Sequence, residues 1–136
     1  MIEAGPENID AVLQFQAISE SSLSYDLLYE SLATSLNHVP MIKIRKVLPP
    51  LINTMSNHFD LNHDQKYGLF IHIACMIDRI IGKEMIKETK HKEDLFDKNP
   101  EAHKYVMHCI HAIEKSFGII VNDDEVAVVL MMCCKL

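Results

Sequence analysis

His72 is the residue in this chain whose type and position most clearly offer chemistry. It lies in a helical stretch from Gly68 to Gly82 that is otherwise almost free of ionisable groups. Arg79 follows seven residues later, about two turns along the same side of a helix. An imidazole with one free ring nitrogen can accept a phosphoryl group, and a nearby cation can offset the added negative charge. The residues alone leave two interpretations open: a phosphoacceptor with Arg79 as its charge partner, or a hydrogen-bonded core histidine with Arg79 in a surface ion pair.

A metal site is the second candidate. His108 and His111 lie three apart with Cys109 between them, which supplies two ligands at a helical spacing. Zinc needs three or four converging ligands, so His72 and Cys75 would complete the set only if the two helices faced each other in register. We therefore predict neither a metal nor another cofactor.

Hydrolase and phosphate-binding motifs are missing from the sequence. It contains no Gly-x-Ser-x-Gly turn, no Gly-rich phosphate loop and no His-Glu-x-x-His. Asp123, Asp124 and Glu125 are better explained as the start of a helix than as an acid and base pair. The chain is accordingly predicted not to be an enzyme.

Composition narrows the class of protein further. The chain has 136 residues, 49% of them hydrophobic, which suits one folded domain, and its net charge is −6. That charge argues against direct binding of nucleic acid. No apolar run reaches the roughly 20 residues that span a membrane, and no signal peptide is visible. Four cysteines without a CxxC pair predict reduced thiols and a cytoplasmic location.

Apolar residues recur three or four apart along most of the chain, which predicts helices. The expected elements are a helix over about 7–19, one over about 23–37, two short helices over about 41–59 divided at Pro49-Pro50, the His72 helix from Asn62 or His63 to about Gly82, a short helix plus loop over 83–98, a helix from Pro100 to Gly118, and a last helix from Asn122 to Leu136. The β-branched run Val126–Val129 could also form a strand. Because no other segment supplies a partner strand, we predict an all-α, compact bundle of about five main helices.

Two segments carry a resemblance to a known family. The run from His72 to Arg79, His-Ile-Ala-Cys-Met-Ile-Asp-Arg, resembles the phosphorylatable segment of phosphotransferase system (PTS) regulation domains. The stretch from Phe117 to Val126, with its Asn-Asp-Asp-Glu, is similar to the start of the family's last helix. The amino-acid sequence of the His72 segment is closer to that of the C-terminal domain copy of levanase-operon-type sigma-54-dependent transcriptional activators than to that of the sugar-operon antiterminators. The resemblance covers roughly residues 23–136, which leaves 1–22 as a linker or extra N-terminal helix.

The resemblance implies a function and a set of partners. It implies a regulatory domain of carbohydrate metabolism that forms a homodimer. It also implies that His72 receives its phosphoryl group from the histidine-containing phosphocarrier protein or from the EIIB component of a sugar permease. DNA and the sigma-54 polymerase would be contacted only by other domains of a longer protein. The family's second histidine would fall at Met132, whose thioether cannot accept a phosphoryl group. Three alternatives are an antiterminator domain, a histidine phosphorelay carrier, and a metal- or ligand-sensing dimerisation module.

Overall fold

The computed structural model describes residues 26–84 and 90–136, and these fall into two units that divide between Thr34 and Ser35. In the first unit residues 26–33 are helical, so this helix ends four residues before the expected position 37. The helix expected over 7–19 lies outside the described residues. Everything below concerns the second unit, Ser35–Leu136.

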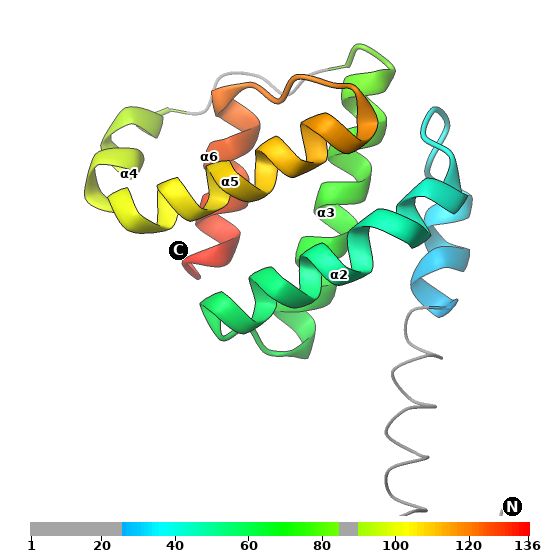
Figure 1. The fold of residues 1–136 in the computed structure, drawn as a ribbon, viewed down its shortest axis with the longest axis horizontal. Coiled ribbons are helices and arrows are strands. Elements are labelled where there is room, and N and C mark those ends of the chain that lie inside the picture. The colour runs from blue at the N-terminus through cyan, green and yellow to red at the C-terminus, as the bar shows by residue number, and fades with distance from the viewer. Residues whose placement is uncertain (1–25, 85–89) are drawn as a thin grey trace, which may run out of the picture. The chain divides into compact units, whose positions relative to one another are not determined.

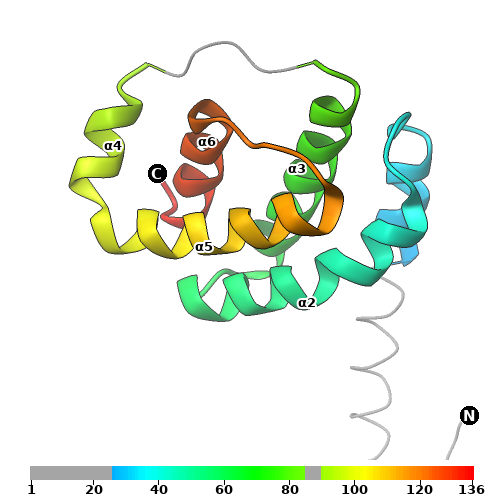
Figure 2. The same cartoon turned by 45° about the horizontal axis from the view of Figure 1, so that its top comes forward.

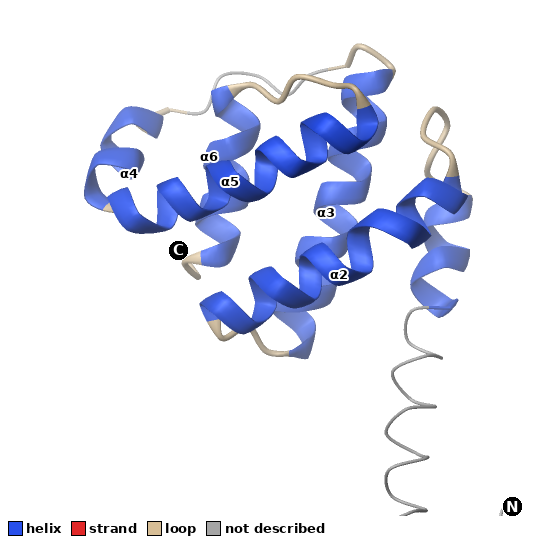
Figure 3. Ribbon diagram, in the orientation of Figure 1, coloured by secondary structure: helices blue, strands red, loops and turns tan. Residues whose placement is uncertain are grey.

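The described residues form helices joined by loops and contain no strand (Figure 3). The second unit contains α2 (Met41–Phe59), α3 (His63–Ile81), α4 (Lys92–Lys98), α5 (Pro100–Phe117) and α6 (Asp123–Cys133). The all-α prediction is thus confirmed, and helix rather than strand is formed over Val126–Val129. Across the described ranges, every helix is too short or too polar to serve as a membrane span.

Helix α2 corrects the prediction of a break at Pro49-Pro50, because it runs without interruption through both prolines. Proline removes a backbone donor and usually disrupts a helix interior. Here a stripe of buried residues continues on both sides of the pair, formed by Ile44, Leu48, Ile52 and Met55. Pro50 is exposed, on the opposite side of the helix, so the carbonyl that loses its partner can face water. Burial of the stripe offsets the lost backbone bonds.

Helix α3 begins and ends as the sequence predicts. Asn62 and Gln65 form a reciprocal capping box, with N to O distances of 2.8 and 2.9 Å, and Gly82 follows the last residue. Helix α3 is buried over most of its length, through Leu69, Phe70, Ile73, Ala74, Met76 and Ile77. A helix that is apolar nearly all round belongs in the centre of a domain, and α3 packs against both α2 and α6.

Helices α5 and α6 also follow their sequence signals. Pro100 occupies the first turn of α5, and Gly118 ends it in the left-handed conformation with φ of 65°. The side chain of Asn122 caps α6 by accepting a hydrogen bond from the Glu125 amide. Between α3 and α5, the predicted short helix is α4.

Helices α2 and α5 lie side by side across α3 and α6 (Figures 1 and 2). They run in opposite directions, since His58 near the end of α2 stacks on Tyr105 near the start of α5, with ring centroids 3.6 Å apart. At the other end, the Lys43 ammonium lies 5.3 Å from the Phe117 ring centroid. The core lies between the two helix pairs, and α3 places His72 and Arg79 on its side facing α6.

Candidate functional site

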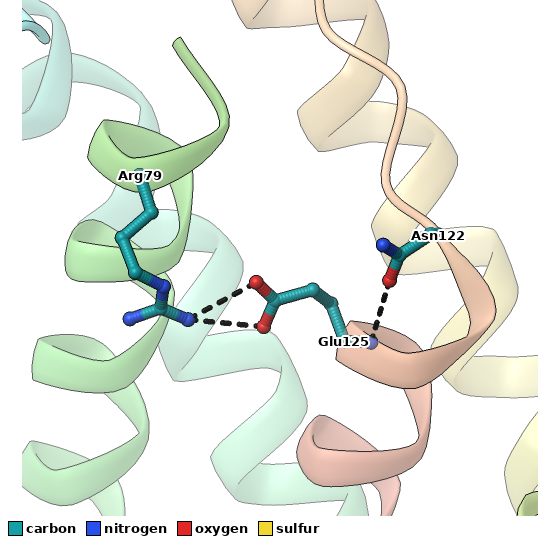
Figure 4. Close-up of polar contacts among 3 residues, drawn as sticks. All are labelled: Arg79, Asn122 and Glu125. Atoms are coloured by element: carbon teal, nitrogen blue, oxygen red, sulfur yellow. Dashed lines mark hydrogen bonds and ion pairs between the residues drawn. The ribbon is translucent and has the colours of Figure 1, made fainter. Parts of the chain in front are cut away.

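Arg79 and Glu125 form an ion pair that joins α3 to the first turn of α6 (Figure 4). Arg79 Nη2 donates to both Glu125 carboxylate oxygens, at 3.0 and 3.1 Å. The Glu125 side chain is fully buried, whereas 31% of the Arg79 side chain is exposed. A buried carboxylate needs such a partner, because an unpaired charge in the protein interior is strongly unfavourable. The pair therefore holds α6 against α3.

The environment of His72 favours a neutral ring. Burial, and secondarily the positive charge of Arg79, lower the pKa of His72 from its ordinary value. Its Nε2 atom is enclosed and has no hydrogen-bond partner, and the same is true of Arg79 Nε. A neutral imidazole keeps one nitrogen lone pair, which is the requirement for a nucleophile. The structure thus places the His72 ring within the electrostatic influence of Arg79, and this cation is already bound to the Glu125 carboxylate.

Asp78 forms a second link between α3 and the rest of the unit. Its carboxylate accepts hydrogen bonds from the backbone N–H groups of Asn37, His38 and Val39, at distances from 2.6 to 3.1 Å. Burial alone would raise the pKa of Asp78, but these three donors lower it below its ordinary value. The adjacent residues Asp78 and Arg79 therefore fix the turn before α2 and the start of α6, respectively.

Met132 occupies the position where the resemblance would place a second histidine. It lies on α6, and a β carbon placed at Gly68 would lie 3.8 Å from its Cε atom. Gly68 precedes His72 by one turn of α3. A thioether therefore lies at this part of the contact between α3 and α6.

The candidate metal ligands do not converge. Within the described residues, no group of three or more His, Cys, Asp or Glu side chains is arranged to hold a metal ion. His108 and His111 are exposed on α5, whereas Cys109 is buried. All four cysteines are free thiols. Burial raises the pKa of Cys133 to about 12, which makes this thiol a poor nucleophile.

Two contacts between distant parts of the chain were missed by sequence reasoning. Glu125 stands in the first turn of α6 with Asp123 and Asp124, as the sequence predicts, but its ion pair with Arg79 was not predicted. Asp78 was given no role. A signal for Glu125 existed, because it precedes the buried Val126 and Ala127, where an unpaired carboxylate would be costly. For Asp78 the only signal was its place in an apolar helix.

The described residues thus place His72, whose pKa is lowered, on the same helix as a partly exposed arginine that pairs with a buried carboxylate. The chain matches the model of the PRD domain over residues 51–133, and it belongs to this family. The family consists of regulatory domains of transcription regulators that are phosphorylated by components of the sugar phosphotransferase system. Comparisons with curated proteins and with solved structures gave no match.

Proposed function

We propose that His72 is the residue through which the phosphotransferase system controls this domain, with the phosphocarrier protein or an EIIB component as the donor. The observation that carries the proposal is the placement of His72 on the same helix as Arg79, whose guanidinium holds the buried Glu125. Membership of the PRD family supports a phosphohistidine switch. Both the placement of His72 and the family match concern this domain alone, so the proposal does not require knowledge of any other domain.

The transfer itself needs a neutral ring whose attacking nitrogen the donor can reach. A lone pair of His72 forms the new N–P bond while the N–P bond of the donor phosphohistidine breaks. The donor imidazole leaves with that electron pair, and the hydrogen on its other nitrogen makes it neutral, so no proton has to move between the two proteins. The lowered pKa of His72 keeps its lone pair available at neutral pH.

Arg79 would transmit the change. A phosphoryl group brings close to two negative charges and three acceptor oxygens, whereas Glu125 offers one charge. If Arg79 turns to the phosphoryl group, Glu125 is left buried without a partner, and the start of α6 must shift to expose or re-pair it. Attachment at the enclosed Nε2 atom would also displace the packing around it. Both effects favour a second packing of α6 on α3.

The amino-acid sequence of the His72 segment also supports a proposal for the full-length protein. We propose that the domain is the C-terminal PTS regulation domain, spanning about 23–136, of a levanase-operon-type sigma-54-dependent activator in the cytoplasm. It would dimerise, and other domains of that protein would contact DNA and the polymerase. An antiterminator is the alternative, which the full-length gene would distinguish by an RNA-binding domain in place of an ATPase.

Phosphotransfer to the purified chain tests the central proposal. The chain is incubated with phosphoenolpyruvate, Enzyme I and the phosphocarrier protein, with and without EIIB, and its intact mass is measured. We expect a gain of about 80 Da, one phosphoryl group, that His72→Ala abolishes. His108→Ala, which changes an exposed histidine of α5, serves as the matched control and should keep the gain. Labelling that survives His72→Ala, or no labelling by any donor, would refute the proposal.

A further inference from the structure

Positive charge is concentrated on α2 and α5, although the chain as a whole is acidic. Helix α2 contains Lys43, Arg45 and Lys46 but no Asp or Glu, and α5 adds Lys104 and Lys115. The two helices together carry five Lys or Arg side chains and two carboxylates, in a chain of net charge −6. Helices α2 and α5 lie side by side (Figure 2), and we call their exposed surface the α2–α5 face.

Most of these cations are not used within the unit. Lys46, Lys104 and Lys115 are exposed and form no ion pair in the described part of the chain. Of the two carboxylates, Glu114 is engaged, since it accepts a hydrogen bond from the Val121 amide at 2.8 Å. Exposed lysines on two neighbouring helices raise the local positive potential and attract negatively charged partners.

The same face contains a groove of about 850 Å³ at the end where α2 stops and α5 begins. Its walls include His58, Phe59, Tyr105, Met107, His108 and His111. The stacked rings of His58 and Tyr105 lie nearly parallel, 5° apart, and Phe59 meets Tyr105 edge-on. Rings already fixed by stacking lose little freedom on binding, so the groove is preorganised for an apolar or aromatic side chain.

We propose that the α2–α5 face docks an acidic segment of a partner protein, which places carboxylates along the lysines and an apolar side chain in the groove. Nucleic acid fits less well. Nucleic acid carries phosphates along its whole length, and these would meet the Glu101 carboxylate in the groove wall, where a protein segment can place an uncharged apolar side chain instead. A protein segment can instead use the apolar part of the groove and the exposed Ile42 beside Lys43.

This surface is separate from the proposed phosphorylation site. His72 lies on the side of α3 that faces α6, as the Arg79–Glu125 ion pair and the proximity of Met132 to Gly68 indicate. Docking on α2 and α5 therefore does not require His72 to be modified, and the inference stands whether or not His72 accepts a phosphoryl group.

The test uses a fluorescent 12-residue peptide of Glu pairs alternating with Leu and Phe, bound to the whole chain at low salt and followed by anisotropy and by amide NMR shifts. A peptide with Lys in place of Glu and a duplex DNA of similar length are compared. The double variant Lys46→Glu with Lys104→Glu removes charge from the face. The matched control, Lys83→Glu with Lys90→Glu, makes the same change of net charge at exposed positions outside both helices. Circular dichroism verifies that both variants stay folded.

We expect the acidic peptide to bind, to shift amides of α2 and α5, and to bind at least about tenfold more weakly to the Lys46 and Lys104 variant than to the control variant. The lysine peptide should not bind. Absence of acidic-peptide binding, equal losses in the two variants, or shifts confined to other helices would overturn the proposal. Tighter binding of the duplex DNA would overturn it in favour of a nucleic-acid surface.

Discussion

Burial of the Arg79–Glu125 pair costs free energy of folding, and removal of one of its two members costs more. Two charges taken from water gain little net stability from each other, yet removal of one leaves the other buried and unpaired. Glu125 is the fully buried member, so it depends on Arg79 more than Arg79 depends on it. This asymmetry suits a conformational switch. A new anion that binds Arg79 would leave Glu125 buried without its cation, which makes the present packing of α6 on α3 unfavourable.

Replacement of Arg79 by methionine tests that dependence. Because Glu125 would lose the cation with which it is paired, we expect Arg79→Met to lower the free energy of unfolding by about 3–5 kcal/mol. Urea denaturation at pH 7 measures the change. The double variant Arg79→Met with Glu125→Leu should recover most of the loss, since it leaves no buried charge. A single variant as stable as the parent would mean that Glu125 finds water instead.

The pH dependence of stability tests the state of His72. Its pKa is lowered in the folded chain, so the folded state binds the proton less readily than the unfolded state. The stabilising contribution of the neutral ring is therefore present above about pH 6.5, the unfolded value, and is lost as the pH falls below it. Urea denaturation between pH 8 and 5 should show a steeper loss for the parent than for His72→Gln. Parallel curves would contradict the buried, neutral ring.

At the scale of the helices, the sequence predicts the helix starts and ends, which depend on residues close together in the chain. The starts of α3 and α6, the proline in the first turn of α5 and the stop at Gly118 each depend on neighbouring residues, and all are found in the structure. The interruption of α2 was wrongly predicted because its continuity depends on tertiary burial of Leu48 and Ile52. The partners of Asp78 and Glu125 are 39 to 46 residues away in the chain, so no local pattern revealed them.

Gly68 offers a stabilising substitution within α3. Glycine in a helix interior costs about 0.5–1 kcal/mol relative to alanine. A β carbon at Gly68 would meet only the Cε atom of Met132 at an ordinary contact distance of 3.8 Å. We therefore expect Gly68→Ala to raise the free energy of unfolding by about 0.5–1 kcal/mol. Gly118→Ala is the contrasting variant, and it should destabilise because φ is 65° there. Thermal or urea denaturation of both variants measures the difference.

The turn before α2 depends on a single carboxylate. Asp78→Asn keeps the shape but removes the charge and exchanges one acceptor oxygen for a donor, so we expect a loss of about 1–3 kcal/mol. Amide hydrogen exchange at Asn37, His38 and Val39 should accelerate. Since the pKa of Asp78 is lowered on folding, its contribution is present above about pH 4 and is lost as the pH falls further. Unchanged exchange at these three amides would refute the role assigned to Asp78.

At the scale of the whole unit, α3 is the element on which both sides depend. It packs on α2 and α6, and its last turns hold the turn before α2 and the first turn of α6. If phosphorylation of His72 moves Arg79, hydrogen exchange should accelerate in the first turns of α6 and change little in α5. Exchange measured by mass spectrometry on phosphorylated and unmodified chain provides the comparison. Uniform acceleration across all helices would instead indicate general destabilisation.

The Arg79–Glu125 contact also sets the register in which α3 and α6 pack. A slide of one helical turn, about 5.4 Å, would part the guanidinium from the carboxylate and leave both without their partner. Intermediate positions would likewise leave the buried carboxylate without its cation, so the contact favours the observed register over small displacements. The need to keep both members of the pair also limits which substitutions are tolerated in evolution. Among related sequences, loss of the cation at position 79 and loss of the carboxylate at position 125 should occur together, as paired changes that record the contact in the history of the family.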